Sequence, residues 1–309
     1  MAGRGGGKRA LLIAGPTASG KSRIAIELAG RFNGVVINAD AMQVYRELQV
    51  LSARPGPEDL NRAHHELYGF VSAAERYSAG RWLEDASRAL EDVWSSGGLP
   101  IVTGGTGLYF KALAGGLADI PAVSPEVRAR VATWSAEEDL DVLSRRLETA
   151  TGERLADRQR LVRALEVHEQ TGRSLNDWQT AKGLNPLDGV AVVKSYLLPE
   201  RSDLYARCEG RLDRMVEDGA LDEVRDLLAL TLDSELPAMK AIGVREFGAH
   251  LAGECSLEEA LTAARTQTWR YAKRQLTWYR GQMQDWPALS PEDALPALQE
   301  QLERLIAAG

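Results

Sequence analysis

Short apolar runs separated by helical stretches form the main pattern of the chain. The runs at residues 9–15, 34–40 and 99–105 each end at glycine or a polar turn. Continuous apolar runs of this length are typical of strands that are buried on both faces of a sheet. Because helical segments lie between them, we predict a parallel sheet with right-handed helical crossovers. A later run, residues 190–198, predicts a further strand of this sheet.

The middle of the chain has a different pattern. Residues 123–182 have helical periodicity and contain no clear strand. We therefore predict two domains, a core formed by residues 1–122 and 190–309 and an all-helical insertion domain at residues 123–189. Beyond residue 199 the pattern predicts helices throughout.

Composition adds that the protein is globular. Of the 309 residues, 44% are hydrophobic and 26% charged, which is enough for a substantial core. No apolar run approaches the roughly 18 residues of a membrane span, and residues 1–9 lead directly into a strand without a signal-peptide core. We expect a cytoplasmic monomer that does not bind membranes. Cys208 and Cys255 lack CxxC or Cys/His spacing, so neither a disulfide framework nor a zinc site is predicted.

The charge of the chain is unevenly distributed. A net charge of −7 argues, taken alone, against a nucleic-acid partner, because phosphates are neutralised by Lys and Arg. Residues 265–280, however, contain five basic residues, four Trp or Tyr residues and no acid. A solvated helix face is the usual explanation for such a run, and the absence of acids favours a contact with RNA.

The most specific single motif is GxxxxGK[ST], which follows the first predicted strand and precedes a helix. It consists of Gly15, Pro16, Thr17, Ala18, Ser19, Gly20, Lys21 and Ser22. The N–H groups of such a loop bind phosphates, Lys21 adds a positive charge, and the Ser22 hydroxyl can bind Mg²⁺. The predicted fold class is therefore α/β, with a P-loop NTPase-like parallel sheet flanked by helices and an all-helical insertion domain.

Polar residues follow the other strands at the same predicted edge of the sheet. The second strand ends at Asp40, and the third is followed by Thr106. Ligands of open parallel sheets gather beyond the carboxyl ends of the strands, so both residues should face the phosphate loop. Asp40 could hold the water shell of Mg²⁺ or act as a general base, and the sequence leaves both roles open.

Six blocks occur in a fixed order along almost the whole chain. They are GPTASGKS, NADAMQVY, the dipeptide Arg54-Pro55, TGGTGLYFKAL, DRQRLVRALEV and AKRQLTW. In this order they resemble the tRNA dimethylallyltransferase (tRNA isopentenyltransferase) family. The resemblance implies transfer of a dimethylallyl group from dimethylallyl diphosphate to N6 of adenosine 37 in the anticodon stem-loop of tRNA. Mg²⁺ is the implied cofactor, and diphosphate is released.

The resemblance also implies roles for single residues. Asp40 would be the catalytic base, with Thr17 and Arg211 beside the donor and residues 15–22 around its diphosphate. The implied tRNA contacts are Asp40, Ala41, Met42, Gln43, Thr106, Arg128, Gln159, Arg160, Leu161, Val162 and Arg163, with Thr106 and Arg128 flanking the tRNA entrance. The family usually has serine at the position of Ala41, and threonine and lysine in the segment of Ser52 and Arg54. These departures concern a hydroxyl contact to the target base.

Two other functions remain open at this point. A P-loop kinase for a small metabolite or nucleotide would use Ser22 and Asp40 for Mg²⁺ and Arg128 or Arg211 as a lid arginine. A GTPase-like switch or an RNA-binding module without chemistry is the third possibility. No NKxD guanine-specifying tetrapeptide follows the later strand, which argues against a GTP switch.

Overall fold

The computed structural model describes residues 7–118, 120–180, 183 and 185–308, and these form two compact units. The larger unit comprises residues 1–114 and 187–309, and the smaller comprises residues 115–186. The first six residues, and residues 181–182 and 184 of the predicted insertion, lie outside the described residues.

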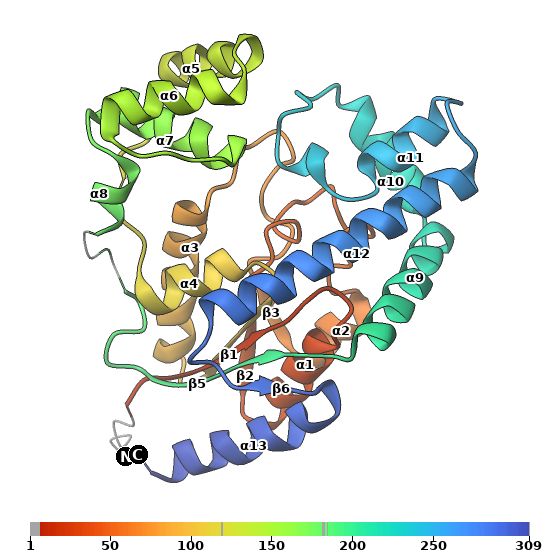
Figure 1. The fold of residues 1–309 in the computed structure, drawn as a ribbon. Coiled ribbons are helices and arrows are strands. Elements are labelled where there is room, and N and C mark those ends of the chain that lie inside the picture. The colour runs from red at the N-terminus through yellow and green to blue at the C-terminus, as the bar shows by residue number, and fades with distance from the viewer. Residues whose placement is uncertain (1–6, 119, 181–182, 184, 309) are drawn as a thin grey trace. The chain divides into compact units, whose positions relative to one another are not determined.

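The larger unit is built on a parallel sheet, as predicted (Figure 1). Among the described residues the sheet has six strands in the order β3-β2-β4-β1-β5-β6, and every neighbouring pair is parallel. The strands are β1 (Arg9–Ala14), β2 (Gly34–Asn38), β3 (His64–Glu66), β4 (Leu99–Gly104), β5 (Ala191–Leu197) and β6 (Ala288–Leu289). Because β1 lies inside the sheet, the loop that follows it opens near the middle of the carboxyl edge.

The four long strands confirm the predicted ones, with ends that differ by at most two residues. The prediction of helices throughout the chain beyond residue 199 is wrong at β6, and β3 was not predicted. Both strands lie at the outer edges of the sheet and contain only two or three residues. In a segment this short the alternation of hydrophobic and polar residues cannot be recognised. Only the pairing of β6 with β5, and of β3 with β2, identifies these segments as strands.

Helices cover both faces of the sheet. In the larger unit they are α1 (Lys21–Arg31), α2 (Pro57–Arg62), α3 (Ala79–Ser95), α4 (Gly107–Gly115), α9 (Arg201–Glu217), α10 (Ala220–Ala229), the 3₁₀ turn η1 (Ala238–Lys240), α11 (Val244–Leu251), α12 (Leu257–Gln282) and α13 (Pro291–Ala307). Helices α1 and α13 pack on one face, whereas α3 packs against β2 and β4 through other side chains. Helices α9 to α12 follow β5 and pack on one another.

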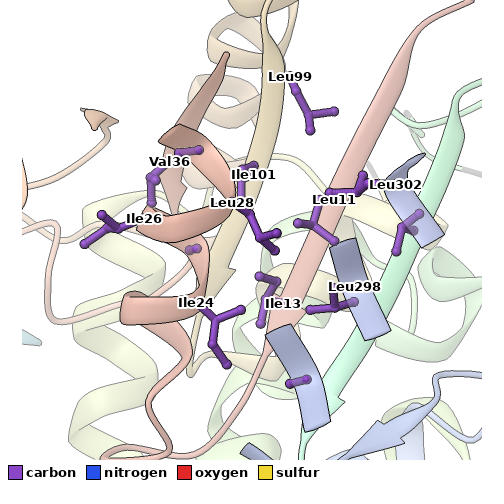
Figure 2. Close-up of a cluster of buried hydrophobic side chains, with 14 of the residues drawn as sticks. Leu11, Ile13, Ile24, Ile26, Leu28, Val36, Leu99, Ile101, Leu298 and Leu302 are labelled. Atoms are coloured by element: carbon purple, nitrogen blue, oxygen red, sulfur yellow. The ribbon is translucent and has the colours of Figure 1, made fainter. Parts of the chain in front are cut away.

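Helix α13, the last of the chain, belongs to the main hydrophobic core. Figure 2 shows Leu298 and Leu302 of α13 beside Leu11 and Ile13 of β1, and all four side chains are fully buried. Alternate residues of β1 and β4 reach this cluster, namely Leu11 and Ile13, and Leu99 and Ile101, as expected for strands whose two faces are covered by different helices. The C-terminal helix therefore stabilises the strand that carries the phosphate loop.

The smaller unit is all-helical in its described residues, as predicted. Its helices are α5 (Pro125–Glu137), α6 (Leu140–Thr151), α7 (Arg158–Thr171) and α8 (Leu175–Gln179). It has its own core, which includes Val131, Leu143, Leu147, Leu161 and Leu165. Nowhere in the described part of the chain is a helix both long and apolar enough to cross a membrane.

A pair of substitutions in α13 tests its place in the core. Leu298→Ala should lower the free energy of unfolding by about 2–5 kcal/mol, because it leaves a cavity against β1. Ile306→Ala on the same helix should change it by no more than about 0.5 kcal/mol, since that side chain is 43% exposed. Chemical denaturation measures both values, and equal values would show that α13 contributes little to the core.

Candidate functional site

The phosphate loop joins β1 to α1 in a conformation that keeps backbone N–H groups available. Ala18 and Gly20 have positive φ angles of 59° and 87°, and the Ser19 N–H donates to the Pro16 carbonyl at 3.3 Å. Gly20, the residue before the helix, has no side chain with which to cap α1. The N–H groups of the first turn therefore remain free for an anion.

Lys21 is half-buried behind this loop. Its Nζ donates to the Pro16 carbonyl oxygen at 3.1 Å. Burial lowers the pKa of Lys21 to about 8, against the opposing effect of the nearby Asp40 carboxylate, and Arg211 lowers it further. Lys21 is thus mostly charged at neutral pH and begins to lose its proton just above it.

Asp40 faces the phosphate loop, as the sheet topology predicts. The fully buried Asn38 fixes its backbone, since Asn38 Oδ1 accepts from Asp40 N at 2.8 Å and Nδ2 donates to Asp40 O at 3.0 Å. The Asp40 Oδ1 atom accepts from Met42 N at 2.9 Å. The carboxylate raises the pKa of both Lys21 and Arg211, so it lies within electrostatic reach of both cations.

Arg211 connects α9 to two loops of the site. Its Nη1 donates to Thr17 Oγ1 at 2.9 Å, and its Nη2 donates to the Ser52 carbonyl at 3.4 Å. Burial lowers the pKa of this guanidinium, whereas Asp40 raises it. Arg211 and Lys21 are therefore two cations in a confined space, with Asp40 as their shared counter-charge.

Two residues of α12 hold the loops together, and neither was assigned a role from the sequence. Gln275 accepts from Thr17 N at 3.0 Å and donates to the Gly105 carbonyl at 2.8 Å. One turn later the Tyr279 hydroxyl lies 3.1 Å from the Gly15 carbonyl and 2.9 Å from that of Gly105. The spacing of four residues on a helix was a visible signal, but nothing in the sequence identified its partners.

Aromatic side chains surround the Asp40 carboxylate. Burial raises the pKa of Tyr68, Tyr109 and Tyr271 well above the usual range, and the charge of Asp40 raises each further. Tyr109 stacks on Trp82 with ring centroids 4.2 Å apart. These phenols therefore stay neutral at physiological pH.

The segment after Asp40 joins the same edge of the sheet. Ala41 N donates to Thr106 Oγ1 at 2.9 Å. The amide of Gln43 donates to the carbonyls of Ser52 and Ala53, both at 3.0 Å. The structure thus brings together several residues that the sequence singled out, namely Thr17, Lys21, Asp40, Ala41, Met42, Gln43, Thr106 and Arg211.

Comparison with known proteins identifies the family. A family model described as IPP transferase matches residues 43–282, and a model described as Isopentenyl transferase matches residues 8–68. The chain belongs to the IPP transferase family. It is 51% identical to the tRNA dimethylallyltransferase of Phenylobacterium zucineum over 290 residues, which cover 92% of this chain and 94% of that relative. Its identity to the tRNA dimethylallyltransferase of Methylobacterium nodulans is also 51%, with 93% and 96% covered.

Solved structures of IPP transferases have the same fold. The full-length tRNA isopentenylpyrophosphate transferase of Bacillus halodurans superposes with a TM-score of 0.70 at 28% identity, and the likeness covers 97% of each chain. A eukaryotic dimethylallyltransferase acting on tRNA superposes with a TM-score of 0.76 at 27% identity, covering 92% of this chain and 74% of that one. Membership of this family favours the transferase prediction over a kinase.

The smaller unit carries the other residues that the resemblance assigned to tRNA. Gln159, Arg160 and Arg163 are exposed on α7. Arg163 and Arg128 both lie beside Glu166, with N–O distances of 3.5 Å and 4.0 Å. Val162 is partly buried, whereas Leu161 is fully buried in the core of the unit, so its side chain is not on the surface.

The residues at the phosphate loop fit a divalent metal of the Mg²⁺ type. No group of three or more His, Cys, Asp or Glu side chains in the described residues could hold a metal by itself. Mg²⁺ does not need such a group, because it commonly binds phosphate oxygens and waters with one or two protein ligands. The exposed Ser22 hydroxyl, in the first turn of α1, is a suitable ligand of this kind.

The lowered pKa of Lys21 predicts how anion binding depends on pH. As the pH rises through about 8, Lys21 loses its proton and its attraction for phosphate. The affinity for inorganic diphosphate should therefore fall about tenfold between pH 7 and pH 9 relative to a Lys21→Arg variant, whose guanidinium stays charged. Calorimetric titration measures both proteins, and identical pH profiles would contradict the role of Lys21.

Proposed function

We propose that this chain transfers a dimethylallyl group from dimethylallyl diphosphate to N6 of adenosine 37, next to the anticodon of tRNA, and releases diphosphate. The observation that carries the proposal is that Asp40, a carboxylate, faces a phosphate loop with two nearby cations, Lys21 and Arg211. One reagent of the reaction is a diphosphate, and the other is an amine that must lose a proton. The site has a group for each.

The donor side stabilises a leaving group that gains negative charge. As the bond between the allylic carbon and the diphosphate oxygen breaks, the electron pair stays on oxygen. Residues 15–22 would surround this diphosphate, with the N–H groups of Gly20, Lys21 and Ser22 as donors. The side chains of Lys21, Thr17 and Arg211 would lie beside it. Such groups act most strongly when they are in place before the charge develops. Mg²⁺, which Ser22 would help to hold, supplies further charge neutralisation when bound.

The acceptor side activates a weak nucleophile. The lone pair of the adenine amine is delocalised into the ring, so the new bond between N6 and carbon forms more readily when Asp40 removes a proton. General-base assistance of this kind is commonly worth about 10²–10⁴ in rate. The adenosine must leave its stack to reach Asp40, at a cost of a few kcal/mol. Tyr271, which is partly exposed, offers an aromatic surface near Asp40.

The partner is the anticodon stem-loop of tRNA. On the acceptor side we assign contacts to Asp40, Ala41, Met42, Gln43 and Thr106. In the smaller unit we assign phosphate contacts to Arg128, Arg160 and Arg163, and a polar contact to Gln159. Val162 would contribute the exposed part of its side chain, whereas the fully buried Leu161 would act only by packing beneath the exposed residues of α7.

One assay separates this function from the kinase alternative. The protein is incubated with undermodified tRNA, labelled dimethylallyl diphosphate and Mg²⁺, and the tRNA is digested to nucleosides. We expect an N6-alkylated adenosine at position 37. Transfer or hydrolysis of the γ-phosphate of ATP, with no use of dimethylallyl diphosphate, would favour the kinase.

The same assay tests the role of Asp40. Asp40→Asn keeps the size of the side chain but cannot accept the proton, so turnover should fall by about 10²–10⁴. Binding of tRNA and of inorganic diphosphate should change little, because the phosphate loop is intact. Unchanged turnover would remove Asp40 from the base role.

A charge reversal tests the RNA contact of the smaller unit. Arg160→Glu should weaken tRNA binding and lower the slope of log affinity against log salt by about 1, since one phosphate contact is lost. Arg145→Glu is the control, because Arg145 is equally exposed in the same unit and makes the same change in net charge. If both variants shift binding equally, the effect comes from overall charge and α7 does not touch the RNA backbone.

A further inference from the structure

Glu223, in the first turn of α10, binds the backbone of a distant loop. Its Oε2 accepts from the N–H groups of Gln49 and Val50, both at 2.7 Å, and its Oε1 accepts from that of Leu51 at 2.9 Å. Three consecutive N–H groups thus converge on one carboxylate. Hydrogen bonds to an ionised acceptor are about twice as strong as neutral ones.

The carbonyl groups that follow this bound stretch point to the candidate site. The Ser52 carbonyl accepts from Arg211 Nη2 at 3.4 Å and from Gln43 Nε2 at 3.0 Å. The Ala53 carbonyl accepts from the same Gln43 amide. The N–H groups of this loop therefore bind α10. Its next two carbonyls bind Arg211, which the proposal puts beside the donor, and Gln43, which it puts beside the acceptor.

Arg54 anchors the C-terminal end of the same loop. Its Nη1 donates to the Tyr45 carbonyl at 3.0 Å, and its Nε donates to Gln49 Oε1 at 2.5 Å. The guanidinium packs on Gly69, where a Cβ atom would lie 1.8 Å from Nη1. Ala53, between the two anchors, has a φ angle of 48°, a conformation that non-glycine residues adopt only when their surroundings enforce it.

We propose that Glu223 is a positioning residue for the transfer reaction. By holding the N–H groups of Gln49, Val50 and Leu51, it fixes the Ser52 carbonyl against which Arg211 and Gln43 are oriented. The Glu223 carboxylate, which lies outside the reacting centre, thereby aligns Arg211 on the donor side with Gln43 on the acceptor side. This role rests on the proposed function of the site.

The neighbouring Asp222 provides a matched control. Both acids lie in the first turn of α10, so both interact favourably with the helix dipole. Asp222 is exposed and pairs with Arg225 on its own helix. Asp222→Asn and Glu223→Gln remove the same charge from the same turn, but only the second change alters the loop.

The test compares these two variants by hydrogen exchange and kinetics. In Glu223→Gln one amide group replaces the acceptor of three N–H groups, so exchange at residues 49–51 should accelerate about tenfold to a hundredfold. The kcat of prenyl transfer should fall by about tenfold or more, because Arg211 and Gln43 lose their orientation. The Kd of inorganic diphosphate should rise by a smaller factor than kcat falls, since Arg211 loses its orientation but Lys21 and the N–H groups of the phosphate loop are untouched. Asp222→Asn should match the wild type in all three measurements.

Two results would overturn the proposal. One is exchange at residues 49–51 that is the same in Glu223→Gln as in Asp222→Asn. The other is faster exchange with unchanged kcat, which would make the contact purely structural. If Glu223→Gln does not fold, Glu223→Asp, whose carboxylate is one methylene shorter, should show the same changes to a smaller degree. Wild-type protein without prenyl transfer would refute the proposed function, and the exchange result would still decide whether Glu223 holds the loop.

Discussion

The site depends on the balance between one carboxylate and two half-buried cations. Lys21 and Arg211 both lose hydration where they lie, and the charge of Asp40 offsets part of that cost. Their remaining hydrogen bonds go to oxygens of the Pro16 and Ser52 carbonyls and the Thr17 hydroxyl. These partners are neutral, so none of them would compete as an anion with the proposed diphosphate for the two cations. The cations are thus oriented before the ligand binds.

Neutral hydrogen bonds hold the frame around these charges. Gln275 and Tyr279 of α12 join the phosphate loop to the turn after β4 through an amide and a phenol. Because neither group is charged, neither competes with a diphosphate for Lys21 or with an amine for Asp40. Both side chains are buried, so water does not weaken these contacts. Lys21, Arg211 and Asp40 thus supply the charges of the site, and the uncharged Gln275 and Tyr279 fix the positions of the loops.

The sequence predicted the parts of this site that depend on local pattern. The phosphate loop has its own motif, and the rule that ligands gather at the carboxyl edge of a parallel sheet correctly put Asp40 opposite it. It did not predict the contacts of Gln275 or Glu223, whose partners Thr17 and Gln49 are 258 and 174 positions away. These contacts form because the fold brings helices α10 and α12 against loops that are distant in the sequence, and no local sequence pattern indicates which segments will meet. The family resemblance assigned a run of α7 to tRNA, but only the structure distinguishes the buried Leu161 from its exposed neighbours.

The position of Asp40 in the sheet is compatible with the base role that we propose for it. Strand β4 lies between β1 and β2, so Asp40 is two strands away from the phosphate loop. Two strand spacings are roughly 10 Å, and in the proposed reaction the donor would lie between the loop and the carboxylate. The intervening strand ends at Gly104, and a Cβ atom on the next residue, Gly105, would lie 2.4 Å from Gln275 Nε2 and 3.1 Å from Asp40 Oδ2. Glycine at position 105 therefore leaves space for the Gln275 amide beside the Asp40 carboxylate. In the proposed reaction Ser22 would help to hold Mg²⁺, which would neutralise charge on the diphosphate, and Asp40 would receive the proton of the acceptor amine.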